Sequence, residues 1–145
     1  MARRYKIISA DSHLDLSPER WRAHVPAKWR DQAPRVVRLE TGEDAIVIGT
    51  RKPAKIGFTR SVNVPRDQLH LQVPTFESSG GTGDAEQRLR EQDEDGIDAE
   101  VQFSRIGYIH GVKDPEGYVA FNRAYNEYLA EEYCAAAPDR LISMA

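Results

Sequence analysis

An aspartate and a histidine one residue apart follow a short apolar run near the start of the chain, Ile7-Ile8-Ser9-Ala10-Asp11-Ser12-His13. Branched apolar side chains predict a buried strand over about residues 5–13. Side chains two apart on a strand point to the same side, so Asp11 and His13 are expected on one face at its carboxyl end. A carboxylate oxygen and an imidazole nitrogen placed together can bind one divalent ion. The alternative is that both residues cap the turn after the strand.

Three further side chains are candidates for contact with a substrate. Trp21 stands on a short helical segment that Ser17 and Pro18 begin, and it is expected either to line a pocket or to pack under a loop. Arg105 can hold a substrate carboxylate through a bidentate pair, unless it is a surface arginine. His110 lies in the same loop after the second predicted strand, where a substrate contact and simple exposure are both open.

The elements that must position these residues alternate between strand and helix. Strands are predicted over residues 99–103 and 141–145, and helices over residues 84–95 and 114–134. Asp84 and Asp114 are N-caps, and Gly96 provides a left-handed stop for the first helix. Apolar side chains recur every three or four residues along the second helix and predict core packing. This alternation is typical of an α/β fold with a parallel sheet.

An insertion is predicted between the first strand and the first helix, over about residues 34–83. Two β-branched runs, residues 35–40 and 45–49, flank a polar turn and predict an antiparallel β-hairpin, with a further short strand within residues 50–58. The stretch 61–83 has weak periodicity, and residues 77–83 within it are rich in glycine and serine. This long loop predicts a mobile surface segment near the mouth of the site.

Four stretches carry longer patterns: Val25-Pro26-Ala27-Lys28-Trp29-Arg30, Asp93-Glu94-Asp95-Gly96-Ile97-Asp98-Ala99-Glu100-Val101, Phe121-Asn122-Arg123-Ala124-Tyr125-Asn126-Glu127-Tyr128-Leu129-Ala130-Glu131 and Ala137-Pro138-Asp139-Arg140-Leu141-Ile142-Ser143-Met144-Ala145. In this order they resemble motifs of the amidohydrolase-related family, which includes aminocarboxymuconate-semialdehyde decarboxylase and several aromatic-acid decarboxylases. The last three look like that family's "M-D-x-x-G-I-D" segment, "R-A-Y-N-D-W-L-A-E" helix and "P-D-R-L-x-G-x-A" entry to the third strand. The resemblance covers nearly the whole chain.

The resemblance implies the N-terminal part of a metal-dependent hydrolase-type TIM (β/α)8 barrel with a small antiparallel β-hairpin insertion. A complete barrel needs about 250 residues, and this chain has 145. It further implies one divalent ion, zinc in the first instance and manganese as the alternative, with Asp11 and His13 as ligands. Many family members have His-x-His or Glu-x-His there, so Asp11 departs from the pattern. The remaining ligand and the catalytic residues are expected beyond Ala145.

The activity that the resemblance implies is hydrolysis or non-oxidative decarboxylation of a small substrate, aromatic or carboxylate-bearing. The 145-residue chain by itself is expected to have no appreciable activity, because three parallel strands leave two open edges. The alternative is a non-catalytic, truncated fragment that acts, if at all, through association, and a homo-oligomer is compatible with either. An independent α/β domain that shares the pattern is the other fold open to this sequence.

Composition excludes several other classes of function. The formal net charge is −3 and the isoelectric point is about 5.8, whereas a nucleic-acid-binding domain usually carries clustered basic residues. No run of 18 apolar residues predicts a membrane span, and no apolar core of a secretory signal follows the start. The single cysteine, Cys134, excludes an internal disulfide framework. A reduced, cytoplasmic setting is expected.

Overall fold

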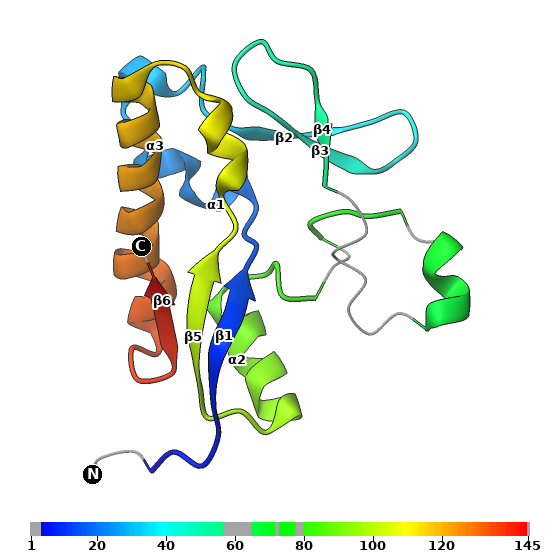
Figure 1. The fold of residues 1–145 in the computed structure, drawn as a ribbon, viewed down its shortest axis with the longest axis vertical. Helices are drawn as coiled ribbons and strands as arrows, with labels where there is room; N and C mark the ends of the chain where they lie inside the picture. The colour runs from blue at the N-terminus through cyan, green and yellow to red at the C-terminus, as the bar shows by residue number, and fades with distance from the viewer. Residues whose placement is uncertain (1–3, 57–64, 72, 78–79, 145) are drawn as a thin grey trace.

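The computed structural model describes residues 4–56, 65–71, 73–77 and 80–144, and these form a mixed α/β structure with two separate sheets. A parallel sheet has the order β1-β5-β6, and an antiparallel sheet has the order β2-β3-β4. The arrowheads of β1 and β5 point toward the end of the molecule where the antiparallel sheet lies (Figure 1). Within the described residues no helix has the length and apolarity needed to cross a membrane.

The parallel sheet consists of β1 (Ile8–Leu14), β5 (Ala99–Ser104) and β6 (Leu141–Met144). Its central strand β5 pairs with both neighbours, and His13, Phe103 and Met144 lie side by side across the three strands. The register of β1 against β5 shifts between Ser9 and Ser12, where three steps along β1 match two along β5. This is a β-bulge of one residue, and bulges of this kind re-aim side chains next to functional sites.

The two main helices begin and end where local sequence signals are strongest. Helix α2 (Ala85–Asp95) is capped by Asp84, whose Oδ1 accepts from the Gln87 amide at 2.9 Å, and Gly96 ends it in the left-handed region with φ 71°. Helix α3 (Pro115–Tyr128) starts in the same way, with Asp114 accepting from two backbone amides. The α-helix predicted over 114–134 is shorter than expected. Its last part is a π-helical turn, Leu129–Tyr133, and a 3-10 turn, Cys134–Ala136.

The π-helical turn has a clear effect on packing. It places Leu129 and Tyr133 both in the buried interior, so the apolar face of α3 continues past the end of the regular helix. The other short helical segments are α1 (Pro18–Trp21), η1 (Arg22–His24), η2 (Ala27–Trp29), η4 (Arg66–Leu71) and η5 (Gly107–Gly111).

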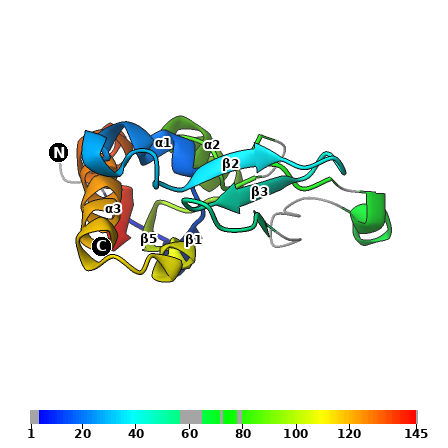
Figure 2. The ribbon, with the colours of Figure 1, turned by 90° about the horizontal axis from the view of Figure 1, so that it is seen from above.

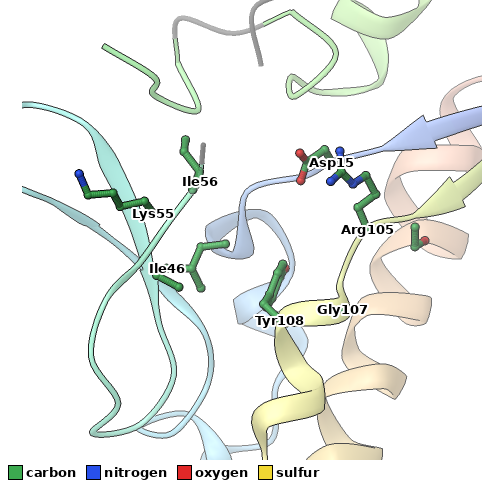
Figure 3. Close-up of a pocket in the computed structure, with 9 residues that line it drawn as sticks. Asp15, Ile46, Lys55, Ile56, Arg105, Gly107 and Tyr108 are labelled. Atoms are coloured by element: carbon green, nitrogen blue, oxygen red, sulfur yellow. The ribbon is translucent and has the colours of Figure 1, made fainter. Parts of the chain in front are cut away.

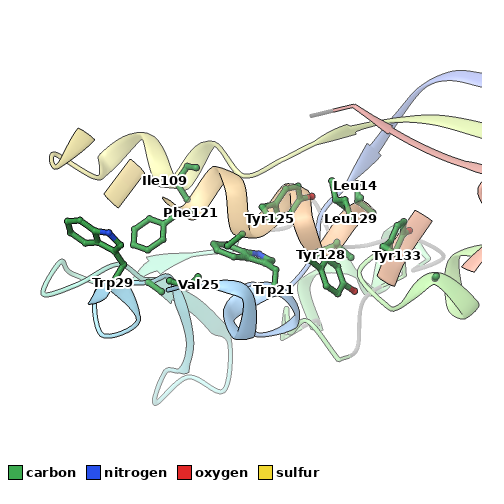
Figure 4. Packing of buried hydrophobic residues seen from close by; sticks show 14 of the residues in the cluster. Leu14, Trp21, Val25, Trp29, Ile109, Phe121, Tyr125, Tyr128, Leu129 and Tyr133 are labelled. Carbon is green, nitrogen blue, oxygen red and sulfur yellow. The ribbon is translucent and has the colours of Figure 1, made fainter. Parts of the chain in front are cut away.

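The apolar core lies between α3, the segment from α1 to η2, and one face of the parallel sheet (Figures 2 and 4). Its largest fully buried side chains include Trp21, Tyr125, Phe121 and Leu14. Trp21 meets Tyr125 edge to face, with ring centroids 5.8 Å apart and planes at 86°. Aromatic pairs of this geometry stabilise a core beyond the area that they bury. The apolar side chains that recur along the second predicted helix therefore pack in the core, as predicted.

A buried polar cluster lies on the covered side of the parallel sheet and comprises Ser12, Arg88, Gln92, Glu100 and Gln102. The Glu100 carboxylate accepts from Arg88 Nε at 2.6 Å, from Arg88 Nη2 at 2.8 Å and from Gln92 Nε2 at 2.8 Å. It also accepts from Gln102 Nε2 at 2.9 Å and from Ser12 Oγ at 2.9 Å. Burial alone raises the pKa of Glu100, but the hydrogen bonds and charge of Arg88 and the hydrogen bond from Gln92 outweigh burial and hold that pKa below its usual 4.5.

The lowered pKa of Glu100 predicts a pH-dependent contribution to stability. The contribution is fully present above the usual carboxyl pKa of 4.5 and is lost as the pH falls through the lower folded-state value. Urea midpoints measured from about pH 7 to about pH 3 are expected to fall more steeply for the wild type than for Glu100→Gln. Other carboxylates act on both proteins alike. Parallel pH profiles for the two proteins would contradict this assignment.

The antiparallel sheet is the predicted insertion, made of β2 (Arg35–Arg38), β3 (Asp44–Val47) and β4 (Ala54–Lys55). Asp44 anchors it, because its carboxylate is buried and accepts from Arg38 Nε at 2.6 Å and from the Phe76 amide at 2.8 Å.

The segment predicted to be mobile is partly fixed. Thr82 is buried and donates to the Phe76 carbonyl, and the Gly81 amide donates to Glu91. Residues 61–64, 72, 78 and 79 of that segment lie outside the described residues, as do residues 57 and 58 of the predicted short strand.

The side of the parallel sheet away from the helices is uncovered by described residues. Phe103, Ile142 and Met144 are 42%, 41% and 47% exposed, and we call this side the open face. The prediction of a buried strand over 5–13 is corrected in two respects. Regular pairing begins at Ile8, and Ile7 and Ile8 are about half exposed because no described element packs on them.

Candidate functional site

A pocket of about 430 Å³ lies between the carboxyl ends of β1 and β5 and the antiparallel sheet (Figure 3). In α/β proteins with parallel strands, ligands bind at this end of the sheet. The residues that line the pocket are Asp15, Ile46, Ala54, Lys55, Ile56, Ser104, Arg105, Gly107 and Tyr108.

The polar wall of the pocket is positioned by the ends of two neighbouring strands. Asp15 directly follows β1, and Arg105 directly follows β5. The Arg105 amide donates to the Leu14 carbonyl at 2.9 Å, which fixes the two loop starts relative to each other. Next to them, Ser104 Oγ donates to the Met144 carbonyl at 3.3 Å. The parallel pairing thus brings together residues about 90 positions apart in the sequence.

Arg105 is the cation of this pocket that can receive an anion. Its side chain is exposed, and none of the residues that the structure describes forms an ion pair with its guanidinium. The other cation, Lys55, forms an ion pair with Glu43 and lowers the pKa of that carboxyl. Figure 3 shows the Lys55 ammonium pointing away from Arg105 and Asp15. An anionic ligand in the pocket therefore meets Arg105 rather than Lys55.

Asp11 and His13 lie on β1, and Asp15, two residues after His13, lines the pocket. Both are exposed, while Ser12 between them is half-buried and bonded to Glu100, and Leu14 is fully buried. This alternation places Asp11 and His13 on the open face. The bulge after Ser9 makes this possible. In a regular strand Asp11, two residues after Ser9, would point to the same side of the sheet as Ser9, toward the helices.

The donor set at this position fits part of a metal shell. A carboxylate oxygen and an imidazole nitrogen are suitable ligands for zinc or manganese, and a catalytic zinc normally takes three protein ligands. Among residues 4–56, 65–71, 73–77 and 80–144, no group of three or more histidine, cysteine, aspartate or glutamate side chains is placed to hold an ion. The pair therefore needs donors from elsewhere to complete a shell.

The structure separates the remaining predicted substrate contacts. Arg105 lies in the pocket, as described above. Trp21 is completely buried in the core against Tyr125, so it packs rather than lines the pocket in this structure. His110, on η5, is exposed outside the pocket lining, where it stacks on Tyr118 with ring centroids 6.0 Å apart. Sequence spacing alone could not distinguish these three environments.

Several residues of the pocket were not among those predicted from the sequence. Asp15 continues the alternation of Asp11 and His13 along the chain, and this period could have suggested it. Tyr108 follows a strand end, as Arg105 does. Ile46 and Ile56 belong to the insertion, and their place opposite Arg105 depends on how the antiparallel sheet packs, which local patterns do not encode.

Comparison with known proteins gives a shared fold. No protein-family model and no curated protein matches the chain. Among solved structures, the chain is similar to the crystal structure of an amidohydrolase from Mycobacterium avium subsp. paratuberculosis K-10, with a TM-score of 0.62 and 18% sequence identity. The match covers 98% of this chain and 42% of that one, so the chain spans less than half the length of its structural neighbour.

Proposed function

We propose that this chain forms part of a metal-dependent enzyme of the amidohydrolase superfamily, built on a partial (β/α)8 barrel of the amidohydrolase-related type. In this proposal Asp11 and His13 are two of the ligands of one divalent ion, which is zinc, with manganese as the alternative. The reaction is hydrolysis or non-oxidative decarboxylation of a small aromatic or carboxylate-bearing molecule in the cytoplasm. The observation that carries the proposal is the exposed Asp11–His13 pair at the carboxyl end of a parallel strand, directly before the pocket.

The chain's own residues have distinct roles in this proposal. A bound ion would polarise a substrate oxygen or lower the pKa of water. Arg105 orients the substrate by holding its carboxylate through two parallel N–H···O bonds. Phe103 and Met144 lie beside His13 on the open face. In this proposal their apolar side chains keep water from one side of Asp11 and His13 when that face is covered. The fold shared with a solved amidohydrolase supports this arrangement.

Metal binding tests the proposal without an activity assay. Zinc titrated into the metal-free chain is expected to bind with a free energy well short of the roughly 10–16 kcal/mol of a structural zinc site, because the Asp11–His13 pair supplies two ligands of a shell that normally has four. His13→Ala is expected to remove this binding. Asp11→Asn is expected to weaken it less, since an amide oxygen can still coordinate. Isothermal titration calorimetry measures all three, and manganese is run in parallel.

The matched control is His110→Ala, which removes an exposed histidine elsewhere on the surface. It should leave the calorimetric titration unchanged. Equal zinc binding by the wild type and His13→Ala would exclude His13 as a ligand and with it the proposed metal site.

A second candidate function is association of copies of the chain without catalysis. The open face favours it, since Phe103, Ile142 and Met144 expose apolar surface on a parallel sheet, and parallel sheets are normally covered on both sides. Sedimentation measured over a range of concentrations distinguishes the candidates, because association through this face makes the mass concentration-dependent and leaves it insensitive to zinc.

A further inference from the structure

The pocket has two chemically different walls. One wall comes from the ends of the parallel strands and carries Asp15, Ser104 and Arg105. The opposite wall comes from the insertion, with Ile46 on β3, Ala54 on β4 and Ile56 directly after β4. Figure 3 shows Ile46 and Ile56 on this side. Among the described residues the charged member of the second wall is Lys55, which is paired with Glu43 and turned away. A ligand that fills the space therefore meets a polar wall with one cation, Arg105, and one carboxylate, Asp15, on one side and aliphatic carbon on the other.

The aliphatic wall is held in place by the backbone of the insertion. Ile46 is paired with Val36 on one side and with Ala54 on the other, and its side chain is almost buried. The Ile56 amide donates to the Asp44 carbonyl at 3.3 Å, and Asp44 is itself anchored by Arg38 and Phe76. Strand pairing on both sides holds Ile46, and one backbone hydrogen bond holds Ile56, so we expect this wall to keep its shape when a ligand binds and to discriminate ligands by size.

We infer that Ile46 and Ile56 are specificity-determining residues, which select ligands with a compact apolar body attached to a carboxylate. This inference rests on the proposed function in taking Arg105 as the group that holds the carboxylate. The discrimination itself comes from the insertion. A hydrophobic pocket rewards each buried carbon group, so a six-membered ring against this wall gains affinity over a methyl group.

The test uses the 145-residue chain in buffer with a metal chelator. Benzoate, cyclohexanecarboxylate and acetate are titrated separately, and binding is followed by NMR of the isoleucine methyl groups. Both ring carboxylates are expected to bind roughly tenfold more tightly than acetate and to shift the Ile46 and Ile56 signals. Ile56→Ala is expected to weaken benzoate binding several-fold and to leave acetate unchanged, because Ala removes carbon that only the ring contacts.

Two controls locate the effect. Ile142→Ala shortens an isoleucine that is more exposed than Ile46 and Ile56 and lies on the open face, outside the pocket lining, and it should leave the preference unchanged. Arg105→Ala should weaken acetate and benzoate equally. If Ile56→Ala loses its native NMR spectrum, Ile46→Val provides the same comparison with a smaller change.

The inference is overturned if none of the three carboxylates binds, if acetate binds as tightly as benzoate, or if Ile56→Ala and Ile46→Val both retain the full preference for benzoate. Because the chelator removes metal from every titration, loss of the Asp11–His13 site would leave these results unchanged. Failure of the metal proposal and failure of this inference are therefore distinguishable.

Discussion

Arg88→Met is expected to lower the free energy of unfolding by about 3–5 kcal/mol, because it leaves a buried carboxylate without its cation. Glu100 is 4% exposed, and Arg88 provides its two charged hydrogen bonds, at 2.6 and 2.8 Å. After the substitution only the neutral donors of Ser12, Gln92 and Gln102 remain. Urea unfolding followed by far-ultraviolet circular dichroism measures the loss.

Two further variants show whether the buried charge is the cause. Arg90→Met changes the same residue type on the same helix. Arg90 is 66% exposed, and its ion pair with Glu86 is long, at 3.9 Å, so the free energy of unfolding is expected to change by no more than about 0.5 kcal/mol. Arg88→Met combined with Glu100→Gln removes both charges and should recover part of the loss, since breaking a buried pair costs more than replacing it. A double variant less stable than Arg88→Met alone would assign the loss to packing around Arg88.

The motifs that carry the family resemblance specify junctions of the fold. Gly96 ends α2 with a positive φ, and Asp98 then accepts from the Lys6 and Ile7 amides at 2.6 and 2.9 Å, which fixes the entry to β1. Arg140 donates to the carbonyls of Ile97 and Asp98 and pairs with Asp93. These contacts explain why the order of strands and helices could be predicted from short patterns. They also explain why those patterns say little about substrate.

The burial of polar residues in β5 could not be predicted from the sequence. Glu100 and Gln102 alternate with Val101 and Phe103, and the usual interpretation places the apolar residues inside. The structure has the opposite arrangement, with Gln102 fully buried under the helices and Phe103 exposed on the open face. The reason is that α2 covers this face of the parallel sheet and contributes Arg88 and Gln92, which donate hydrogen bonds to the buried Glu100 carboxylate.

In the candidate site, too, features set by neighbouring residues could be predicted from the sequence, and features set by tertiary contacts could not. The spacing of Asp11 and His13 is local and predicted a shared face, and the side chains of both are exposed in the structure. The bulge before Asp11 depends on pairing with β5, and the aliphatic wall depends on the packing of the insertion. Neither leaves a period in the sequence, because each is set by residues far away along the chain.

Trp21→Ala is the second substitution with a large expected effect, a loss of about 3–5 kcal/mol in the free energy of unfolding. Trp21 is completely buried and packs edge-on against Tyr125, so truncation leaves a cavity at the centre of the core. Its Nε1 has no hydrogen-bond partner among the described residues. Trp21→Phe is therefore expected to cost well under half as much, because it keeps an aromatic ring and removes a buried, unsatisfied donor.

Urea unfolding combined with the benzoate titration distinguishes packing from a role in the pocket. A residue of the core changes the urea midpoint and leaves the affinity of the folded fraction for benzoate unchanged. A pocket residue does the reverse, weakening benzoate with little change in midpoint. Trp21→Phe is the more informative variant here, because its smaller expected loss of stability should keep it folded over the whole titration. Weaker benzoate binding by Trp21→Phe at an unchanged midpoint would return Trp21 to the pocket, and would require the segment from α1 to η1 to open toward Arg105.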